Sequence, residues 1–108
     1  MIENIVKETI RQLIRDGLLK SPQDIAYREI TARLRQYYKD GETDPDLYRA
    51  IEKLAEDPYS KILPLYFRYG YTIEAIAEAL DVDVTTITRN KKRLSIKIYE
   101  ILEDIEDD

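Results

Sequence analysis

The chain of 108 residues contains no cysteine, no histidine and no tryptophan. Without cysteine it has no disulfides, no thiolate metal ligands and no thiol nucleophile. Without histidine it lacks the commonest general base and the commonest metal ligand. We therefore expect a protein that is not an enzyme and that needs neither a metal nor a cofactor.

Residues that interrupt regular structure are also scarce, with three glycines and four prolines. The chain can therefore hold long helices, and its length is enough for one compact domain with a core. No apolar run approaches the roughly 20 residues of a membrane span. The opening "MIENIVKETI" lacks the uninterrupted apolar stretch of a signal peptide. These absences predict a cytoplasmic protein with no membrane contact.

Charge is unevenly distributed along the chain. Residues 1–84 carry 12 cations and 16 anions, residues 85–99 carry five cations and no anion, and residues 100–108 carry six anions and no cation. The three segments have net charges of −4, +5 and −6, which together give the −5 of the whole chain. A basic segment inside an acidic protein has two explanations: a helix that reads DNA, or the solvated face of an ordinary surface helix.

Helix signals dominate the first half of the chain. Apolar residues at three- and four-residue steps predict a helix over about residues 2–19. The string "SPQD" at 21–24 contains a capping serine, a proline suited to the first turn and an acid at the positive helix end. It predicts a second helix that ends before Gly41. The string "TDPDLY" at 43–48 predicts a third helix, with Asp44 as its cap.

A fourth helix is expected after Asp57, which could cap it with Pro58 in its first turn. Pro64 lies in the middle of this pattern, so the helix either kinks there or begins late. Gly70 is placed to end it.

The last third of the chain has the most regular pattern. Thr72 can cap a short helix over Ile73–Leu80, and Asp83 can cap a long one from Val84 to about Asp104. No segment alternates in the manner of a strand, so the chain is predicted to be all-α, with about six helices.

We divide this all-α chain into two regions. Residues 1–56 form an N-terminal helical region that could serve the core, oligomerisation or partner contact. Residues 57–108 hold the last helices and end in the acidic tail "EDIEDD". The tail is predicted to be solvated, and it could also shield the basic segment from non-specific DNA.

The last two helices and the "DVD" between them have the spacing of a helix-turn-helix. That motif needs a small residue where the helices approach, which Ala77 supplies. The inward apolar positions fall on Ile76, Leu80 and Ile87, and Val82 would fill the turn. An ordinary surface helix does not require this preceding pattern, so the pattern favours DNA binding.

Two positions depart from the motif. Asp81 stands where glycine is frequent, although aspartate tolerates the left-handed conformation better than most residues. Asn90 stands where an apolar residue would extend the stripe from Ile87, so it needs hydrogen-bond partners if it is buried. Alternatively, a small rotation of the helix lets the stem of Lys91 cover the apolar surface.

The register divides the basic segment into residues that read bases and residues that hold phosphates. Threonine can contact base edges and thymine methyl groups, and arginine can bind guanine through two hydrogen bonds. Contacts with phosphates position a protein without reading sequence. The predicted base-reading residues are Val84, Thr85, Thr88, Arg89 and Lys92. The predicted phosphate-binding residues are Thr72, Thr86, Lys91, Arg93 and Lys97.

The segment "YTIEAIAEALDVDVTTITRNKKRLSIKIYEIL" resembles region 4 of bacterial sigma factors, the helix-turn-helix that reads the upstream promoter element. Residues 57–98, which combine "DPY" with "TRNKKRL", are more similar still to regulators of the RinA and ArpU type, carried by phages and integrative elements. The resemblance implies a transcription activator of phage or mobile-element genes in a bacterial or phage-infected cell. It also implies two partners, double-stranded DNA and RNA polymerase. Asp83 and Val84 depart from the polar or basic residues that sigma factors often carry there.

Three further uses stay open. The same fold could be a protein-interaction or DNA-packaging module, such as a polymerase-binding adaptor or a small-terminase-like subunit. The paired aspartates of "DPDLY" and "DVDV" could bind a metal, although helix capping explains them more simply. Clustered tyrosines or the stripe of residues 2–19 could form a homodimer interface, although positions in or beside the core are the simpler explanation.

Overall fold

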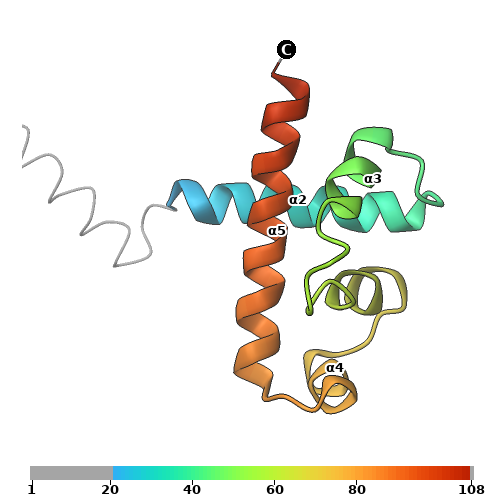
Figure 1. Ribbon diagram of the computed structural model, residues 1–108, viewed down its shortest axis with the longest axis vertical. Coiled ribbons are helices and arrows are strands. Elements are labelled where there is room, and N and C mark those ends of the chain that lie inside the picture. The colour runs from blue at the N-terminus through green and yellow to red at the C-terminus, as the bar shows by residue number, and fades with distance from the viewer. Residues whose placement is uncertain (1–20, 108) are drawn as a thin grey trace, which may run out of the picture.

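The computed structural model describes residues 21–107, which form helices and no strand (Figure 1). The elements are α2 (Pro22–Lys39), α3 (Pro45–Glu52), the π-helix η1 (Pro64–Arg68), α4 (Ile73–Leu80) and α5 (Val84–Glu106). The predicted all-α class is confirmed, and these five helices are close to the number expected. The helix predicted over residues 2–19 lies outside the described residues.

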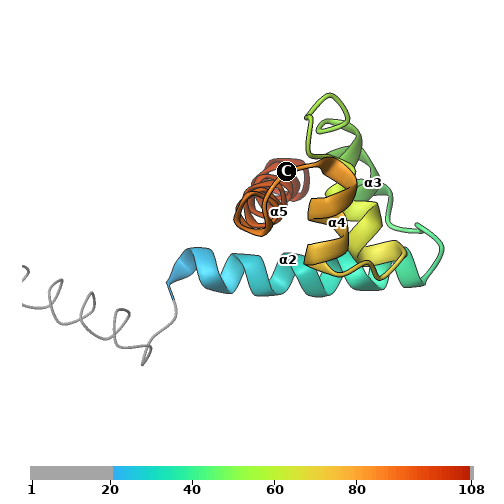
Figure 2. The same ribbon diagram turned by 90° about the horizontal axis from the view of Figure 1, so that it is seen from below.

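The long helix α5 organises the arrangement. It crosses α2 at a steep angle, and α3, η1 and α4 all lie on the same side of it (Figures 1 and 2). The short helix α4 lies beside the N-terminal end of α5. The beginning of α5 and all of α4 are therefore at one end of the molecule, and the acidic end of α5 is at the other.

The predicted starts of α2 and α3 are confirmed by their caps. The Asp24 amide donates to Ser21 Oγ at 3.1 Å, and the Ser21 amide donates back to Asp24 Oδ2 at 3.4 Å. The Leu47 amide donates to Asp44 Oδ1 at 3.2 Å. These bonds satisfy amide groups that have no acceptor within the helix. α3 ends at Glu52, and Leu54 lies in the turn that follows.

Of the two alternatives for the fourth helix, the structure has the late start. Residues 53–61 form turns, and the π-helix η1 begins at Pro64, which has no amide hydrogen to donate to the preceding turn. The Tyr69 amide donates to the Pro64 carbonyl, five residues back, at 3.0 Å. The predicted role of Asp57 as a helix cap is wrong. Its Oδ1 accepts from the Tyr59 amide at 2.9 Å and closes a local turn instead.

The connection from α4 to α5 follows the predicted capping closely. Thr72 Oγ1 accepts from the Ala75 amide at 3.1 Å, and Asp83 Oδ1 accepts from the Thr86 amide at 2.7 Å. Between the two helices, Asp81 has the left-handed conformation, with φ 56° and ψ 47°. This residue ends α4 and lets the chain turn into α5 within three residues.

The left-handed conformation of Asp81 gives a stability prediction. We expect Asp81→Gly to raise the free energy of unfolding by about 0.5 kcal/mol, because glycine adopts this conformation without a penalty from Cβ. We expect Asp81→Val to lower it by about 1–2 kcal/mol, because β-branched residues are strongly disfavoured there. Denaturant unfolding followed by circular dichroism measures both. Equal midpoints for the two variants would contradict the prediction.

The core consists of two clusters of buried residues. The larger one joins α2 and α3 to the middle and end of α5, and contains Ile30, Leu34, Tyr37, Leu47, Ala50, Leu54, Leu63, Leu94, Ile98 and Leu102. The smaller one joins α4 to the start of α5 and contains Ile62, Ile76, Ala77 and Ile87, with Leu80 and Val82 packed against it. The inward positions predicted for the last two helices are therefore confirmed. The larger cluster draws on both sides of the boundary expected near residue 56, so the two regions share a core.

The acidic end of α5 is part of the folded structure. The helix runs through Glu106, two residues beyond the predicted end, and Glu106 Oε1 accepts from Arg33 at 2.7 Å. Arg33 also binds Asp44 at 2.8 Å, and this hydrogen bond lowers the pKa of Asp44. At 1.5 Å per residue, Glu106 lies roughly 25 Å along the helix from Arg89. Glu106 therefore cannot reach Arg89 while α5 is intact.

Candidate nucleic-acid interface

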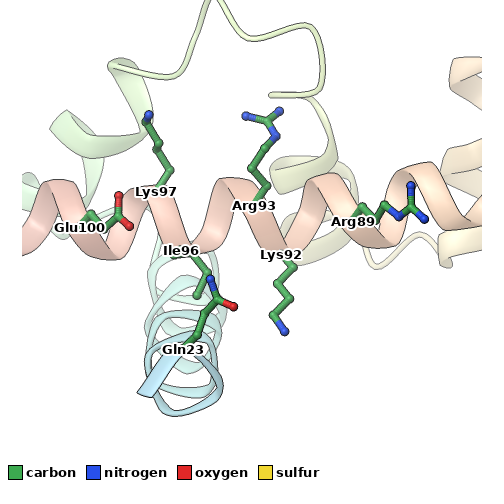
Figure 3. Close-up of a pocket in the computed structure, with 7 residues that line it drawn as sticks. All are labelled: Gln23, Arg89, Lys92, Arg93, Ile96, Lys97 and Glu100. Atoms are coloured by element: carbon green, nitrogen blue, oxygen red, sulfur yellow. The ribbon is translucent and has the colours of Figure 1, made fainter. Parts of the chain in front are cut away.

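The basic segment forms one exposed face of α5. Figure 3 shows Arg93 and Lys97 extending to one side of the helix, and Lys92 and Ile96 to the other, where Ile96 lies beside Gln23 of α2. This part of α5 forms the wall of an open groove, which is lined by Gln23, Arg89, Lys92, Arg93, Ile96, Lys97 and Glu100. The lining contains four cations and one acid, and this excess of positive charge suits a polyanion.

The predicted base-reading residues at the start of α5 are mostly exposed. Val84, Thr85, Thr88 and Arg89 lie at the surface. The Thr88 hydroxyl donates to the Val84 carbonyl at 3.1 Å, which leaves its methyl group and its oxygen lone pairs for other contacts. Within residues 21–107, Arg89 makes no ion pair and no side-chain hydrogen bond. Its guanidinium is therefore available to a ligand.

Lys92, the fifth predicted reader, lies beside the first turn of α2. Its Nζ is 3.5 Å from Asp24 Oδ1, and about half of each side chain is exposed to solvent. Ion pairs this long and this exposed contribute little to stability. Lys92 can therefore leave Asp24 when a stronger anion is present.

Lys91, a predicted phosphate-binding residue, points away from the groove. Its Nζ donates to the Tyr27 hydroxyl at 2.8 Å and lies 4.1 Å from the centroid of the Tyr66 ring. The Phe67 ring is 5.7 Å away. These contacts join α5 to α2 and η1, as expected from the alternative in which Lys91 covers apolar surface. The Lys91 charge is thus held inside the molecule.

Arg93 lies at the edge of the groove, and each of its three guanidinium nitrogens has a partner. Its Nε donates to Asn90 Oδ1 at 2.9 Å, and its two terminal nitrogens lie 2.9 Å and 3.0 Å from the oxygens of Asp57. The hydrogen bond from Arg93 lowers the pKa of Asp57. Asn90 also donates to the Thr86 carbonyl at 2.8 Å, so this half-buried residue has a partner at both ends of its amide. The departure of Asn90 from the motif is thereby explained.

The remaining predicted phosphate-binding residues lie on different parts of the surface. Lys97 is exposed on the face of α5 that holds Arg89 and Arg93. Thr86 is half-buried on the flank of the helix. Thr72 is at the N-terminus of α4, outside the groove, and its oxygen accepts the capping hydrogen bond described above.

Two residues near this face were not predicted to belong to it. Gln23 lines the groove from α2, far away in sequence, and no periodic pattern links it to α5. Asp57 was expected to cap a helix, and the structure pairs it with Arg93. A hydrophobic pattern cannot reveal either contact, because both depend on how α2 and the loop after α3 pack against α5.

The charges within α5 run against the helix dipole. The first turn of α5 contains no acid and its last turn contains no base. A helix is stabilised by the opposite arrangement, with acids near its N-terminus and bases near its C-terminus. Apart from the capping Asp83, the helix dipole therefore does not account for the order of charges in α5, and several of these charges have partners on other elements, as Arg93 has in Asp57 and Glu106 has in Arg33.

The aspartates considered as metal ligands have other roles. Asp44 and Asp83 cap helices, and Asp81 makes the left-handed turn. Within residues 21–107, no three acidic side chains come together in a way that could bind a metal ion. No helix in the same range is both long and apolar enough to cross a membrane.

No protein-family model, curated protein or solved structure matches the chain.

Proposed function

We propose that this chain is a sequence-specific DNA-binding transcriptional regulator, with α4 and α5 as its helix-turn-helix. The N-terminal half of α5 enters the major groove, which is wide enough for an α-helix. Thr88, Arg89 and Lys92 contact base edges, and Lys97 contacts a phosphate beside them. As the resemblance to phage regulators implies, the protein activates genes and contacts RNA polymerase.

The observation that carries this proposal is the exposed guanidinium of Arg89 on the cationic face of α5. A cation on a surface helix commonly pairs with a nearby acid, as Lys92 and Arg93 do here. Arg89 has uncharged neighbours at Thr85 and Thr86 one turn before it and at Thr88 next to it, and within residues 21–107 no acid forms an ion pair with it. An unpaired arginine among threonines suits the recognition of a guanine next to a thymine.

A second candidate function is protein binding through the loop before α4. Tyr69 and Tyr71 are 59% and 48% exposed, and the Arg68 guanidinium lies 5.3 Å from the Tyr69 ring centroid. Tyrosine and arginine are enriched at protein interfaces. In this alternative, the chain is an adaptor or a packaging subunit, and its basic face has no sequence preference.

Selection of bound fragments from a random duplex library separates the two functions. A regulator is expected to enrich one recurring sequence motif, because base contacts distinguish sites by about 1–3 kcal/mol each. The adaptor function predicts bound fragments without a shared motif, or no bound fragments. Tyr71→Ala should leave the selected motif unchanged. A changed motif would contradict the proposal that base contacts come from α5 and not from the loop before α4.

The salt dependence of binding should report how many cations on α5 bind phosphates. Arg89, Lys92 and Lys97 are available, so we expect a slope of about −3 for log K against log salt, at about 0.9 per phosphate. Fluorescence anisotropy with a labelled random duplex, on which Arg89 and Lys92 also contact phosphates, gives this slope. A slope near −5 would mean that Lys91 and Arg93 also bind phosphates, and a slope near zero would contradict DNA binding by this face.

A further inference from the structure

Arg93 is the most strongly held cation on the proposed DNA-binding face. Three of its nitrogens have partners, one on Asn90 and two on the carboxylate of Asp57. Two parallel contacts between a guanidinium and a carboxylate form one of the stronger ion pairs found in proteins. The free protein therefore presents Arg93 with its charge largely compensated.

Asp57 is held in place independently of Arg93. Its Oδ1 accepts from the Tyr59 amide, and its side chain is only 18% exposed. Tyr59 in turn packs against both core clusters. The carboxylate is thus anchored by the loop, and Arg93 must leave it to reach a phosphate.

We propose that Asp57 restrains Arg93 from binding phosphates and so lowers the affinity of this face for DNA of any sequence. The inference rests on the proposed function. Non-specific affinity comes almost entirely from phosphate contacts, so each restrained cation weakens it. A phosphate contact carries no sequence information, so the restraint lowers specific and non-specific affinity by a similar factor. Asp57 therefore sets how tightly the protein binds DNA, and the base-reading residues set which sequence it prefers.

Asp24 and Lys92 provide an internal comparison on the opposite side of α5. Their contact is single, it is 3.5 Å long, and both side chains are about half exposed. The shorter, double contact of Asp57 with Arg93 involves a much less exposed acid. Removal of the Asp24 charge should therefore change non-specific affinity less than removal of the Asp57 charge.

The test is Asp57→Asn, which keeps an oxygen for the Tyr59 amide and removes the charge that holds Arg93. We expect the affinity for a random duplex to rise roughly three- to tenfold at about 0.1 M salt, and the salt slope to steepen by about 0.9. Affinity for the selected duplex should rise by a similar factor, because a phosphate contact carries no sequence information. Thermal unfolding of the variant checks that it is folded.

Two control variants separate this role from a simple change of net charge. Asp104→Asn removes an exposed acid from α5, the helix that contains Arg93, at a position far from the groove. It should leave the slope of log K against log salt unchanged. With Arg93→Gln already present, Asp57→Asn should no longer steepen the slope. A steeper slope in that background, or an unchanged slope with Arg93 intact, would overturn the inference.

Elution from a heparin column distinguishes failure of this inference from failure of the proposed function. Asp57→Asn should elute at higher salt than the wild type, because heparin is a polyanion without base pairs. If that shift occurs but the wild type selects no duplex motif, the proposed function fails and the restraint of Arg93 stands. If a motif is selected but the shift is absent, the restraint of Arg93 alone fails.

Discussion

Arg89→Ala is expected to weaken binding to the selected duplex by about 1–3 kcal/mol, a loss of roughly tenfold to a hundredfold. The substitution removes the exposed guanidinium of Arg89, which has no ion pair within residues 21–107 and which we propose contacts guanine through two hydrogen bonds. Binding to a random duplex should fall less, because only one phosphate contact is lost there. Thr88→Ala should act in the same direction with a smaller effect. Anisotropy titrations with both duplexes measure the two losses.

Arg49→Ala is the matched control for this prediction. Arg49 is an exposed arginine in the last turn of α3, which packs beside α5 but away from the groove. It carries the same charge as Arg89 and should change neither the motif nor the specific affinity. If Arg89→Ala and Arg49→Ala have equal effects on the two duplexes, then Arg89 contributes charge and does not read a base.

Ile87→Ala is expected to lower the free energy of unfolding by about 2–4 kcal/mol. Ile87 is fully buried in the smaller cluster, where it packs with Ile76 and Ala77 of α4 and with Ile62. Removal of three carbon atoms leaves a cavity between the two helices, and rigid surroundings fill such a cavity only in part. Thermal and denaturant unfolding measure the loss, and the melting temperature should fall by about 10–20 °C.

Ile96→Ala on the same helix is the control for this loss. Ile96 is only half-buried and lines the groove, where it lies beside Gln23 of α2 (Figure 3). Ile96→Ala should lower the free energy of unfolding by less than about 1 kcal/mol, because Ile96 buries less apolar area than Ile87. A similar loss at both positions would mean that α5 does not present one inner and one outer face.

Most of the fold could be predicted because its signals are local. The caps at Ser21, Asp44, Thr72 and Asp83 depend on a hydrogen bond to an amide three residues away, so each is visible in a short string. The left-handed turn at Asp81 was also expected from its position. The late start of η1 was one of two alternatives, because a proline in a helical pattern permits either a kink or a new beginning.

The partners of the basic residues could not be predicted in the same way. Lys91 meets Tyr27, which lies 64 residues earlier, and Arg93 meets Asp57, which lies 36 residues earlier. Such contacts depend on the crossing of α2 over α5 and on the path of the loop after α3. Periodicity shows which face of α5 is buried, but not which acids or aromatic rings lie at the edges of that face.

The two faces of α5 have a consequence for how this protein can change over evolutionary time. Ile87, Leu94 and Ile98 of α5 are buried in the two core clusters. Thr85, Arg89 and Lys92 of the same helix lie outside both clusters. Substitution on the outer face leaves the core intact, because surface changes usually cost little stability. Under the proposed function, a lineage of such proteins can therefore acquire new DNA targets by exchanging a few outward residues, while the buried side of α5 preserves the architecture.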